Sequence, residues 1–184
     1  MKKIVILFSG GLDSNVLLQQ AKMLGYEPYC LFIDYDQLHI QEKSFARKMC
    51  KKENVPFQTV TLGNLKIDSK LTNPNHVENE DLTISKWYVP SRNLMFVSIA
   101  ASIAESIKAV EIWYGASYED TINLFPDCTQ EWVGKVNEVL QMNSNYKVKL
   151  RAPLLGYDQQ QVETIARNFK INKSEIFSGY GNIK

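Results

Sequence analysis

Cysteine is scarce in this chain of 184 residues: there are three, Cys30, Cys50 and Cys128, and no two of them form a CxxC pair. An odd number of widely spaced cysteines is typical of proteins in a reducing compartment rather than of disulfide-stabilised secreted domains. Structural zinc sites need closely spaced pairs of ligands, which these cysteines do not provide. We therefore expect a cytoplasmic protein that has no zinc site.

Long hydrophobic runs and an excess of either charge are missing as well. The longest purely apolar run, Ile4 to Phe8, is far shorter than the roughly 20 residues of a membrane-spanning helix. The start of the chain leads into a strand pattern rather than a signal peptide. The 21 basic and 20 acidic residues leave a net charge of +1, which excludes a polybasic surface for nucleic acid. Residues 1–184 therefore predict a single domain with neither a membrane nor a nucleic acid as partner.

Short apolar runs alternate with stretches of helical periodicity along the chain. Unbroken apolar runs are typical of strands that are buried on both faces, and repeated strand–helix units favour parallel strands with right-handed connections. We therefore predict an α/β fold of the Rossmann-like type, with a mostly parallel five-stranded sheet and helices on both faces. The predicted strands are 4–8, 29–33, 57–62, 110–114 and 148–150, and the predicted helices are 16–24, 40–53, 94–107, 130–142 and 159–169.

Two connections and the end of the chain lack this periodicity. Residues 63–89 contain an acidic patch and little regular pattern, and we predict an irregular, lid-like segment, because long structureless connections in compact domains are usually lids or disordered. Residues 115–128 follow the fourth predicted strand. Ligands of open α/β sheets bind outside the carboxyl ends of the strands, so we expect both segments beside one crevice. Residues 171–184 are predicted to form a short C-terminal tail.

The first strand is followed at once by Ser9-Gly10-Gly11-Leu12-Asp13-Ser14. Two glycines allow a sharp turn and a close approach to a ligand, and the amides at the start of the next helix attract an anion. The hydroxyls of Ser9 and Ser14 can bind phosphate oxygens. Asp13 indicates Mg²⁺, because a carboxylate beside a phosphate needs a cation between them. The alternative is an ordinary turn in which a Ser or Asp side chain caps the helix.

Five motifs together resemble the 7-cyano-7-deazaguanine synthases of the queuosine pathway, a family within the N-type ATP pyrophosphatases. They are Phe8 to Ser14 (FSGGLDS), Asp34 to Gln37 with His39 and Glu42 (DYDQxHxxE), Val89 to Asn93 (VPSRN), Gly115 to Cys128 with Asp120 and FPDC, and Ala152 to Leu154 (APL). The first motif alone identifies only the superfamily, whereas the five in this order are much more specific.

The resemblance implies a set of site residues. ATP would be bound by Phe8, Ser9, Gly10, Gly11, Asp13, Ser14, Asp34, Tyr35 and Gln37, with Mg²⁺ held by Asp13 through the ATP phosphates. The catalytic residues would be Asp13, Ser14 and Arg92, and the substrate would be bound by His39, Arg92, Asn93, Asp120 and Asp127.

Elementary chemistry supports several of these assignments. Asp34 to Gln37 ends the second strand, where an adenosine would lie in this fold class. Arg92 follows a proline-containing turn at a helix start and can clamp a carboxylate or phosphate with two hydrogen bonds. Asp120 and Asp127 can accept hydrogen bonds from two adjacent N–H donors of a guanine-like ring.

Simpler interpretations of the same residues stay open. His39 can be a helix-surface residue that pairs with Glu42. Arg92 can be an exposed, solubilising residue, and Asp127 can cap the helix that follows it. Cys128 is more often a packed, inert thiol than a nucleophile.

The resemblance also implies the reaction, an ATP-dependent ligation. The carboxylate of 7-carboxy-7-deazaguanine attacks the α-phosphate of ATP and pyrophosphate leaves. Ammonia then converts the acyl adenylate to an amide, which a second ATP activates for dehydration to the nitrile. The implied substrates are therefore this acid and ammonia, and the implied cofactors are ATP and Mg²⁺. Members of the family are commonly homodimers.

The sequence departs from the family pattern near its end and at three other positions. Ser178-Gly179-Tyr180 stands where the family has an SCY element followed by zinc-binding cysteines, Gln159 replaces a lysine, and Asp36 and Ser91 each replace a glycine. These departures weaken the resemblance as support for the full two-step, nitrile-forming activity more than as support for ATP binding. Three alternatives therefore stay open: transfer of the deazaguanine to a protein or nucleic acid, a different amidation or thiolation, and a degenerate nucleotide-binding partner subunit.

Overall fold

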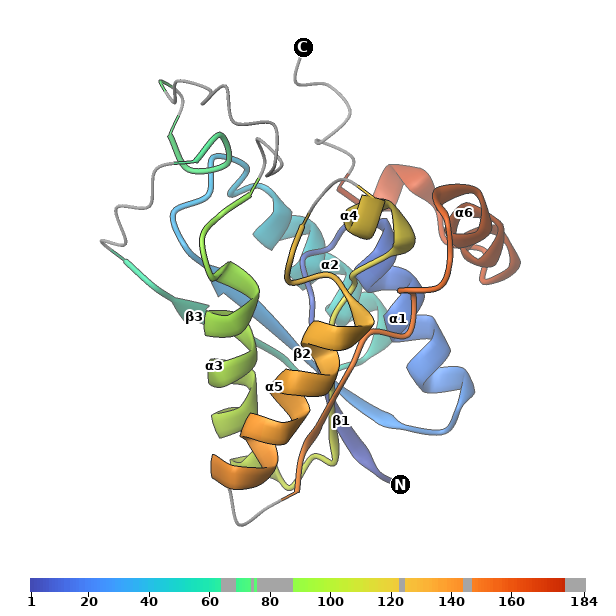
Figure 1. The fold of residues 1–184 in the computed structure, drawn as a ribbon. Coiled ribbons are helices and arrows are strands. Elements are labelled where there is room, and N and C mark those ends of the chain that lie inside the picture. Colours follow the sequence, from blue (N-terminus) through green and yellow to red (C-terminus); the bar gives the residue numbers. More distant parts are fainter. Residues whose placement is uncertain (64–68, 74, 76–87, 123–124, 144–146, 178–184) are drawn as a thin grey trace.

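The computed structural model describes residues 1–63, 69–73, 75, 88–122, 125–143 and 147–177. Strands and helices alternate along the chain, as Figure 1 shows. The strands are β1 (Lys3–Leu7), β2 (Glu27–Asp34), β3 (Phe57–Thr61), β4 (Glu111–Trp113) and β5 (Lys149–Arg151). The helices are α1 (Leu12–Met23), α2 (Glu42–Glu53), α3 (Arg92–Ile107), α4 (Tyr118–Ile122), α5 (Gln130–Asn143), α6 (Gln159–Asn168) and the short 3₁₀ helix η1 (Lys173–Glu175).

The five strands form one parallel sheet in the order β3-β2-β1-β4-β5. The chain first builds the sheet outward from β1 to β3, and then returns past β1 to place β4 on its other side. The order of the strands therefore reverses between β1 and β4. A crevice opens at the carboxyl ends of the strands at such a reversal, and it is the usual place for a ligand in this class of fold. The predicted α/β fold is confirmed.

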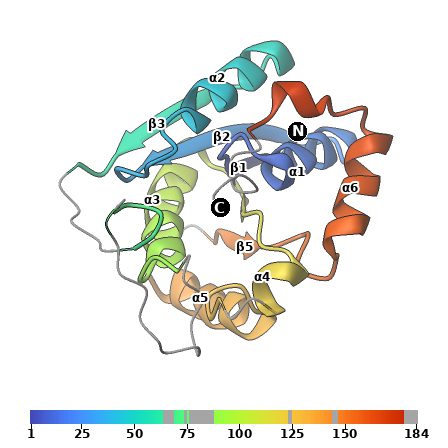
Figure 2. The same cartoon turned by 90° about the horizontal axis from the view of Figure 1, so that it is seen from above.

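Alternate residues of β1 enter two separate hydrophobic cores. Ile4 and Ile6 pack with side chains of α1, α2 and α6, whereas Val5 packs with side chains of α3 and α5 on the opposite face. Successive side chains of a strand point to opposite faces, so an unbroken apolar strand requires helices on both sides. Figure 2 shows α3 and α5 on one side of the sheet and α1 and α2 on the other.

Several boundaries differ from the sequence prediction. Helical spacing is clear in the sequence only over residues 16–24, and the helix expected to begin in the loop before them starts at Leu12, with Gly11 as its N-cap. Helix α2 begins two residues later than predicted, at Glu42. Helix α4 was not predicted, since its five residues are too few to show a helical period. Most of the predicted lid (64–68, 74 and 76–87) and the end of the predicted tail (178–184) lie outside the described residues. No described helix is long and apolar enough to cross a membrane.

Candidate active site

The loop between β1 and α1 packs directly against α2. Gly10 has φ +85°, in the left-handed region that favours glycine. A Cβ atom at this position would lie 2.8 Å from the backbone N of Ala46, too close for any side chain. The first glycine of the loop is therefore required both by its own backbone conformation and by its neighbour in α2.

Asn15, which the sequence analysis missed, fixes the orientation of two loop peptides. Its buried Nδ2 donates to the carbonyl oxygens of Gly10, at 3.0 Å, and Gly11, at 2.8 Å. In a planar trans peptide the N–H points opposite to the C=O. The N–H groups of Gly11 and Leu12 are therefore directed away from Asn15 and from the core. The signal in the sequence was an Asn directly after the Asp-Ser pair, but an Asn at this position is equally consistent with a helix surface.

The two serines of the loop are already part of its hydrogen-bond network. Ser14 Oγ accepts from the N–H of Gly10 at 3.1 Å and donates to the carbonyl of Gly11 at 3.0 Å. Ser9 Oγ accepts from the N–H of Gly11 at 3.3 Å and lies 3.3 Å from Ser14 Oγ. The N-cap of α1 is Gly11, and no side chain caps the helix. The alternative of an ordinary turn capped by a Ser or Asp side chain is therefore wrong, and the first amides of α1 offer donors to an anion.

Asp13 lies where the loop between β1 and α1 meets the segment after β4. A Cβ atom on Gly115 would be 3.2 Å from the Cβ of Asp13, so the two loops are in contact. Burial raises the pKa of Asp13 to about 7, and the negative charge of Asp120 adds to the shift. At this pKa the carboxyl of Asp13 holds a proton for much of the neutral pH range unless a positive charge lies beside it. No group of three His, Cys, Asp or Glu side chains in the described part of the chain could hold a metal ion by itself.

Asp120 acts on Asp13 through its charge, and Asp127 of the same irregular loop acts in turn on Asp120. Ser117 fixes Asp120, because its N–H and Oγ donate to Oδ2 of Asp120 at 2.8 and 3.2 Å. Burial raises the pKa of both carboxyls, while the positive charge of Arg92 opposes the shift in each. Burial and these two acids also raise the pKa of the Cys128 thiol well above its usual range. Cys128 is therefore an inert thiol rather than a nucleophile.

Arg92, the first residue of α3, is held in place by Tyr35. Its Nη1 donates to the Tyr35 hydroxyl at 3.2 Å, and its guanidinium lies 5.9 Å from the centre of the Tyr35 ring. The neighbouring Asn93 donates from Nδ2 to Cys128 Sγ at 3.8 Å. The structure thus brings Arg92, Asn93, Asp120 and the end of β2 together from distant parts of the sequence, and it does not support Arg92 as a merely solubilising residue.

Three residues predicted to bind ATP have other contacts in this structure. Phe8 is 1% exposed, and its side chain is part of the core between β1 and α1. Gln37 is buried, and its Oε1 accepts from the N–H of Tyr35 at 2.9 Å, which shapes the turn after β2. Asp34 forms an ion pair with Lys43 at 3.1 Å. The side chain of Phe8 is therefore unable to contact a ligand, and a contribution from this residue would come from its backbone.

His39 lies in the turn before α2 rather than on the helix. Its carbonyl accepts from the N–H of Glu42, the first helical residue. Its ring lies 5.5 Å from the ring of Phe177, with 49° between the ring planes. The interpretation of His39 as a helix-surface residue is therefore wrong, because the helix begins only at Glu42.

The two positions at which this chain lacks a family glycine have the same backbone conformation. Asp36 has φ +62° and Ser91 has φ +54°. Both values lie in the left-handed region, which glycine adopts far more readily than other residues. The chain thus keeps the turns that the glycines would form, and both turns border the candidate site. Gln159, which replaces the lysine, is the exposed first residue of α6.

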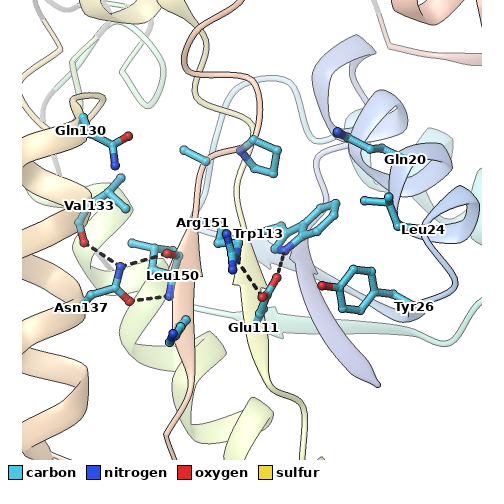
Figure 3. A pocket seen from close by; sticks show the side chains of 13 residues that line it. Gln20, Leu24, Tyr26, Glu111, Trp113, Gln130, Val133, Asn137, Leu150 and Arg151 are labelled. Atoms are coloured by element: carbon cyan, nitrogen blue, oxygen red, sulfur yellow. Dashed lines mark hydrogen bonds and ion pairs between the residues drawn. The ribbon is translucent and has the colours of Figure 1, made fainter. Parts of the chain in front are cut away.

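A separate pocket of about 550 Å³ lies along β4 and β5, as Figure 3 shows. In it, Glu111 accepts from Trp113 Nε1 at 2.7 Å and pairs with Arg151 Nε at 2.8 Å. The side-chain amide of Asn137 binds both the N–H and the carbonyl of Leu150 at the edge of the sheet (Figure 3). None of the predicted site residues lines this pocket. It is therefore distinct from the candidate active site.

Comparisons with known proteins find relatives in the family that the five sequence motifs resemble. A family model described as queuosine biosynthesis protein QueC matches residues 3–184. The chain is 30% identical to the 7-cyano-7-deazaguanine synthase of Pseudoalteromonas translucida, covering 97% of this chain and 84% of that protein. It is 34% identical to the 7-cyano-7-deazaguanine synthase of Coxiella burnetii, covering 98% and 84%.

Solved structures with low sequence identity share the fold. A predicted subunit of tRNA methyltransferase from Methanocaldococcus jannaschii matches with a TM-score of 0.61 and 15% identity, over 91% of this chain and 75% of that one. NMN synthetase from Francisella tularensis matches with a TM-score of 0.58 and 15% identity, over 94% and 63%. At this level of identity the likeness concerns the fold alone.

Proposed function

The chain belongs to the family of queuosine biosynthesis proteins QueC, and from this premise we propose that it is a 7-cyano-7-deazaguanine synthase. It would consume ATP to convert 7-carboxy-7-deazaguanine and ammonia first to the amide and then to the nitrile, with release of AMP and pyrophosphate. The observation that carries the proposal is the loop after β1. Its hydrogen bonds direct the Gly11 and Leu12 amides away from the core, directly before the partly buried Asp13 in the chain.

In this proposal the loop binds the phosphates of ATP. The first amides of α1 and the hydroxyls of Ser9 and Ser14 would exchange their present partners for phosphate oxygens. Asp13 is suited to hold Mg²⁺ together with those oxygens, because a divalent cation would favour its charged form over the protonated form that burial stabilises. When bound, Mg²⁺ neutralises the charge that develops on the departing pyrophosphate. Asp34 ends β2 and Tyr35 and Gln37 follow it, where the adenosine would lie in this class of fold.

The deazaguanine would lie between α3 and the loop after β4. Asp120 and Asp127 would accept hydrogen bonds from the N–H groups of the ring, as carboxylates do with adjacent donors. Arg92 and Asn93 stand at the start of α3, where Arg92 would bind the carboxylate that is to be adenylated. Asp127 is buried and Asp120 is partly buried, which favours this role because poorly hydrated acceptors bind donors more strongly.

Product analysis tests the proposed function. The protein is incubated with ATP, Mg²⁺, ammonia and 7-carboxy-7-deazaguanine, and mass spectrometry separates the acid, the amide and the nitrile. We expect the nitrile to form together with AMP and pyrophosphate. Asp13→Ala and Ser14→Ala should each reduce turnover by about a hundredfold or more. Glu138→Ala, which removes an exposed carboxylate on α5, is the matched control. Absence of any acid-dependent pyrophosphate release would refute the proposal.

Three further features belong to the same proposal. The fold and the family support nucleotide use, and Mg²⁺ is proposed as the metal on the chemistry of Asp13. A cytoplasmic location is supported by the three cysteines, which are all free thiols. A homodimer is proposed from the family resemblance, and sedimentation equilibrium would test it.

A further inference from the structure

The end of the described chain returns to the phosphate loop. After α6 the chain turns back toward α2, as Figure 2 shows. Phe177 then forms a parallel β-bridge with Gly11, and the N–H of Phe177 donates to the carbonyl of Gly10 at 3.0 Å. The two segments are separated by more than 160 positions in the sequence, so this contact is a product of the tertiary fold.

Several contacts hold Phe177 in this position. Ile176 is buried and packs in the core with side chains of α1 and α6. Glu175 forms an ion pair with Lys52 of α2. The ring of Phe177 contacts the ring of His39 at 5.5 Å and the ring of Phe45 at 6.0 Å. The segment is thus anchored on both sides of the loop rather than lying loosely over it.

These contacts fix the peptide between Gly10 and Gly11. Its carbonyl accepts from two donors that belong to different parts of the chain, Asn15 Nδ2 and the N–H of Phe177, both at 3.0 Å. With the carbonyl held on this side, the N–H of Gly11 must point to the opposite side. There it lies at an exposed position 3.3 Å from Ser9 Oγ. If either donor released this carbonyl, the peptide unit between the two glycines could rotate.

We propose that Phe177 is a positioning residue for the phosphate loop. Its backbone N–H holds the Gly10–Gly11 peptide so that the Gly11 N–H faces the phosphates of ATP, and its ring keeps His39 beside the loop. The inference rests on the proposed function, because it explains the geometry of the loop by the binding of ATP. The donor of this backbone contact, Phe177, lies outside the five family motifs, whereas the acceptor, Gly10, belongs to the first of them.

Three variants of the full chain separate the backbone contact from the ring and from stability. Replacing Phe177 by its α-hydroxy acid analogue, through nonsense-codon suppression, exchanges the N–H for an ester oxygen and keeps the ring. Phe177→Ala keeps the N–H and removes the ring. Val136→Ala removes a buried side chain of α5 on the opposite face of the sheet, does not touch the segment, and is the control for a mere loss of stability.

The readouts are amide hydrogen exchange of the loop without ligand, and the dissociation constant of Mg·ATP by calorimetry. The ester variant should exchange the Gly11 amide faster and bind Mg·ATP about tenfold more weakly, which corresponds to about 1.4 kcal/mol. Phe177→Ala should weaken Mg·ATP less than the ester variant does. Val136→Ala should lower the melting temperature and leave the affinity for Mg·ATP within about twofold of the wild type.

The inference is overturned if the ester variant binds Mg·ATP as the wild type does with unchanged exchange of Gly11, or if Val136→Ala weakens binding equally. Failure of the proposed function is a separate result. In that case the wild type forms no product from 7-carboxy-7-deazaguanine, while the exchange and affinity comparisons still decide the role of Phe177. Should the wild type bind no Mg·ATP at all, both proposals fall.

Discussion

Gly115 packs so closely on Asp13 that a Cβ atom on the glycine would lie 3.2 Å from the Cβ of Asp13. The contact joins the phosphate loop after β1 to the loop after β4, which carries Asp120 and Asp127. The negative charge of Asp120 acts on Asp13 across the same boundary. The two loops therefore form one site, and the position of Asp13 depends on the absence of a side chain at residue 115.

Gly115→Ala should reduce activity more than stability. The added methyl group must displace Asp13 by a few tenths of an ångström, because 3.2 Å is tighter than an ordinary contact. Small displacements of catalytic groups are costly, so kcat should fall by about tenfold or more. Gly156→Ala is the control, since a Cβ there would meet no atom within 4 Å. Equal activity of the two variants would show that the position of Asp13 does not depend on Gly115.

Gly10→Ala should destabilise the protein by about 3 kcal/mol, from left-handed strain together with overpacking. A Cβ at this position would lie 2.8 Å from Ala46 N, and backbone cannot move aside as a flexible side chain can. Gly25→Ala isolates the strain, because Gly25 has φ +76° but open space around it. It should cost about 1 kcal/mol. Urea unfolding of both variants measures the difference, and similar losses would exclude the steric contribution of α2.

Asp13→Asn should stabilise the ligand-free protein at neutral and alkaline pH while abolishing activity. The folded pKa of about 7 lies above the ordinary value of 3.8, so the native state keeps a proton that the unfolded state has lost. Stability that depends on this proton is present at low pH and is lost as the pH rises through about 7. Asparagine has no proton to lose. The difference in unfolding free energy between Asp13→Asn and the wild type should therefore grow by about 1.4 kcal/mol for each pH unit between the ordinary pKa of 3.8 and the folded pKa of about 7.

Urea unfolding of wild type and Asp13→Asn at several pH values between 4 and 8 measures this advantage. The exposed substitution Glu138→Gln controls for the loss of a carboxylate, and it should change stability by less than about 0.5 kcal/mol throughout. An Asp13→Asn difference that does not vary with pH would contradict the burial of this carboxyl.

Ser91→Gly should stabilise the protein. Ser91 precedes α3 with φ +54°, a conformation that costs a non-glycine residue about 1–2 kcal/mol. The greater freedom of glycine in the unfolded chain offsets part of this gain, so we expect a net increase of about 0.5 kcal/mol. Ser102→Gly makes the same exchange within α3, at an exposed helical position. It should instead destabilise by about 0.5 kcal/mol. Thermal unfolding distinguishes the two signs, and a loss at both positions would refute the strain at Ser91.

Tyr35→Phe should weaken binding of 7-carboxy-7-deazaguanine without affecting ATP. The change removes the hydroxyl that accepts from Arg92 Nη1 and leaves the aromatic ring under the guanidinium. Loss of one hydrogen bond of about 0.5–1.5 kcal/mol should raise the KM for the acid by about 3- to 10-fold. Tyr29→Phe removes a hydroxyl that donates to Gln58 near the other end of β2. It should leave the KM for the acid and the KM for ATP unchanged. A rise in the KM for ATP alone would instead favour contact of Tyr35 with the nucleotide.

The strands, most helices and the phosphate loop were predictable from the sequence because their signals are local. An unbroken apolar run such as Ile4 to Phe8 marks a strand that is covered on both faces, and the structure covers it in this way. Two glycines followed by Asp13 and Ser14 mark a loop that approaches an anion. The switch from extended to helical periodicity is set by neighbouring residues, so it is visible without knowledge of the fold.

The partners of the site residues were decided by tertiary structure. Tyr35 and Gln37 were predicted to bind ATP, yet the turn after β2 uses Gln37 to hold its own backbone and Tyr35 to hold Arg92. Phe177 reaches Gly10 only because α6 packs on α1 and directs the chain back to the loop. Such contacts join residues far apart in sequence. Their geometry depends on how helices and strands pack, which no local pattern of amino acids encodes.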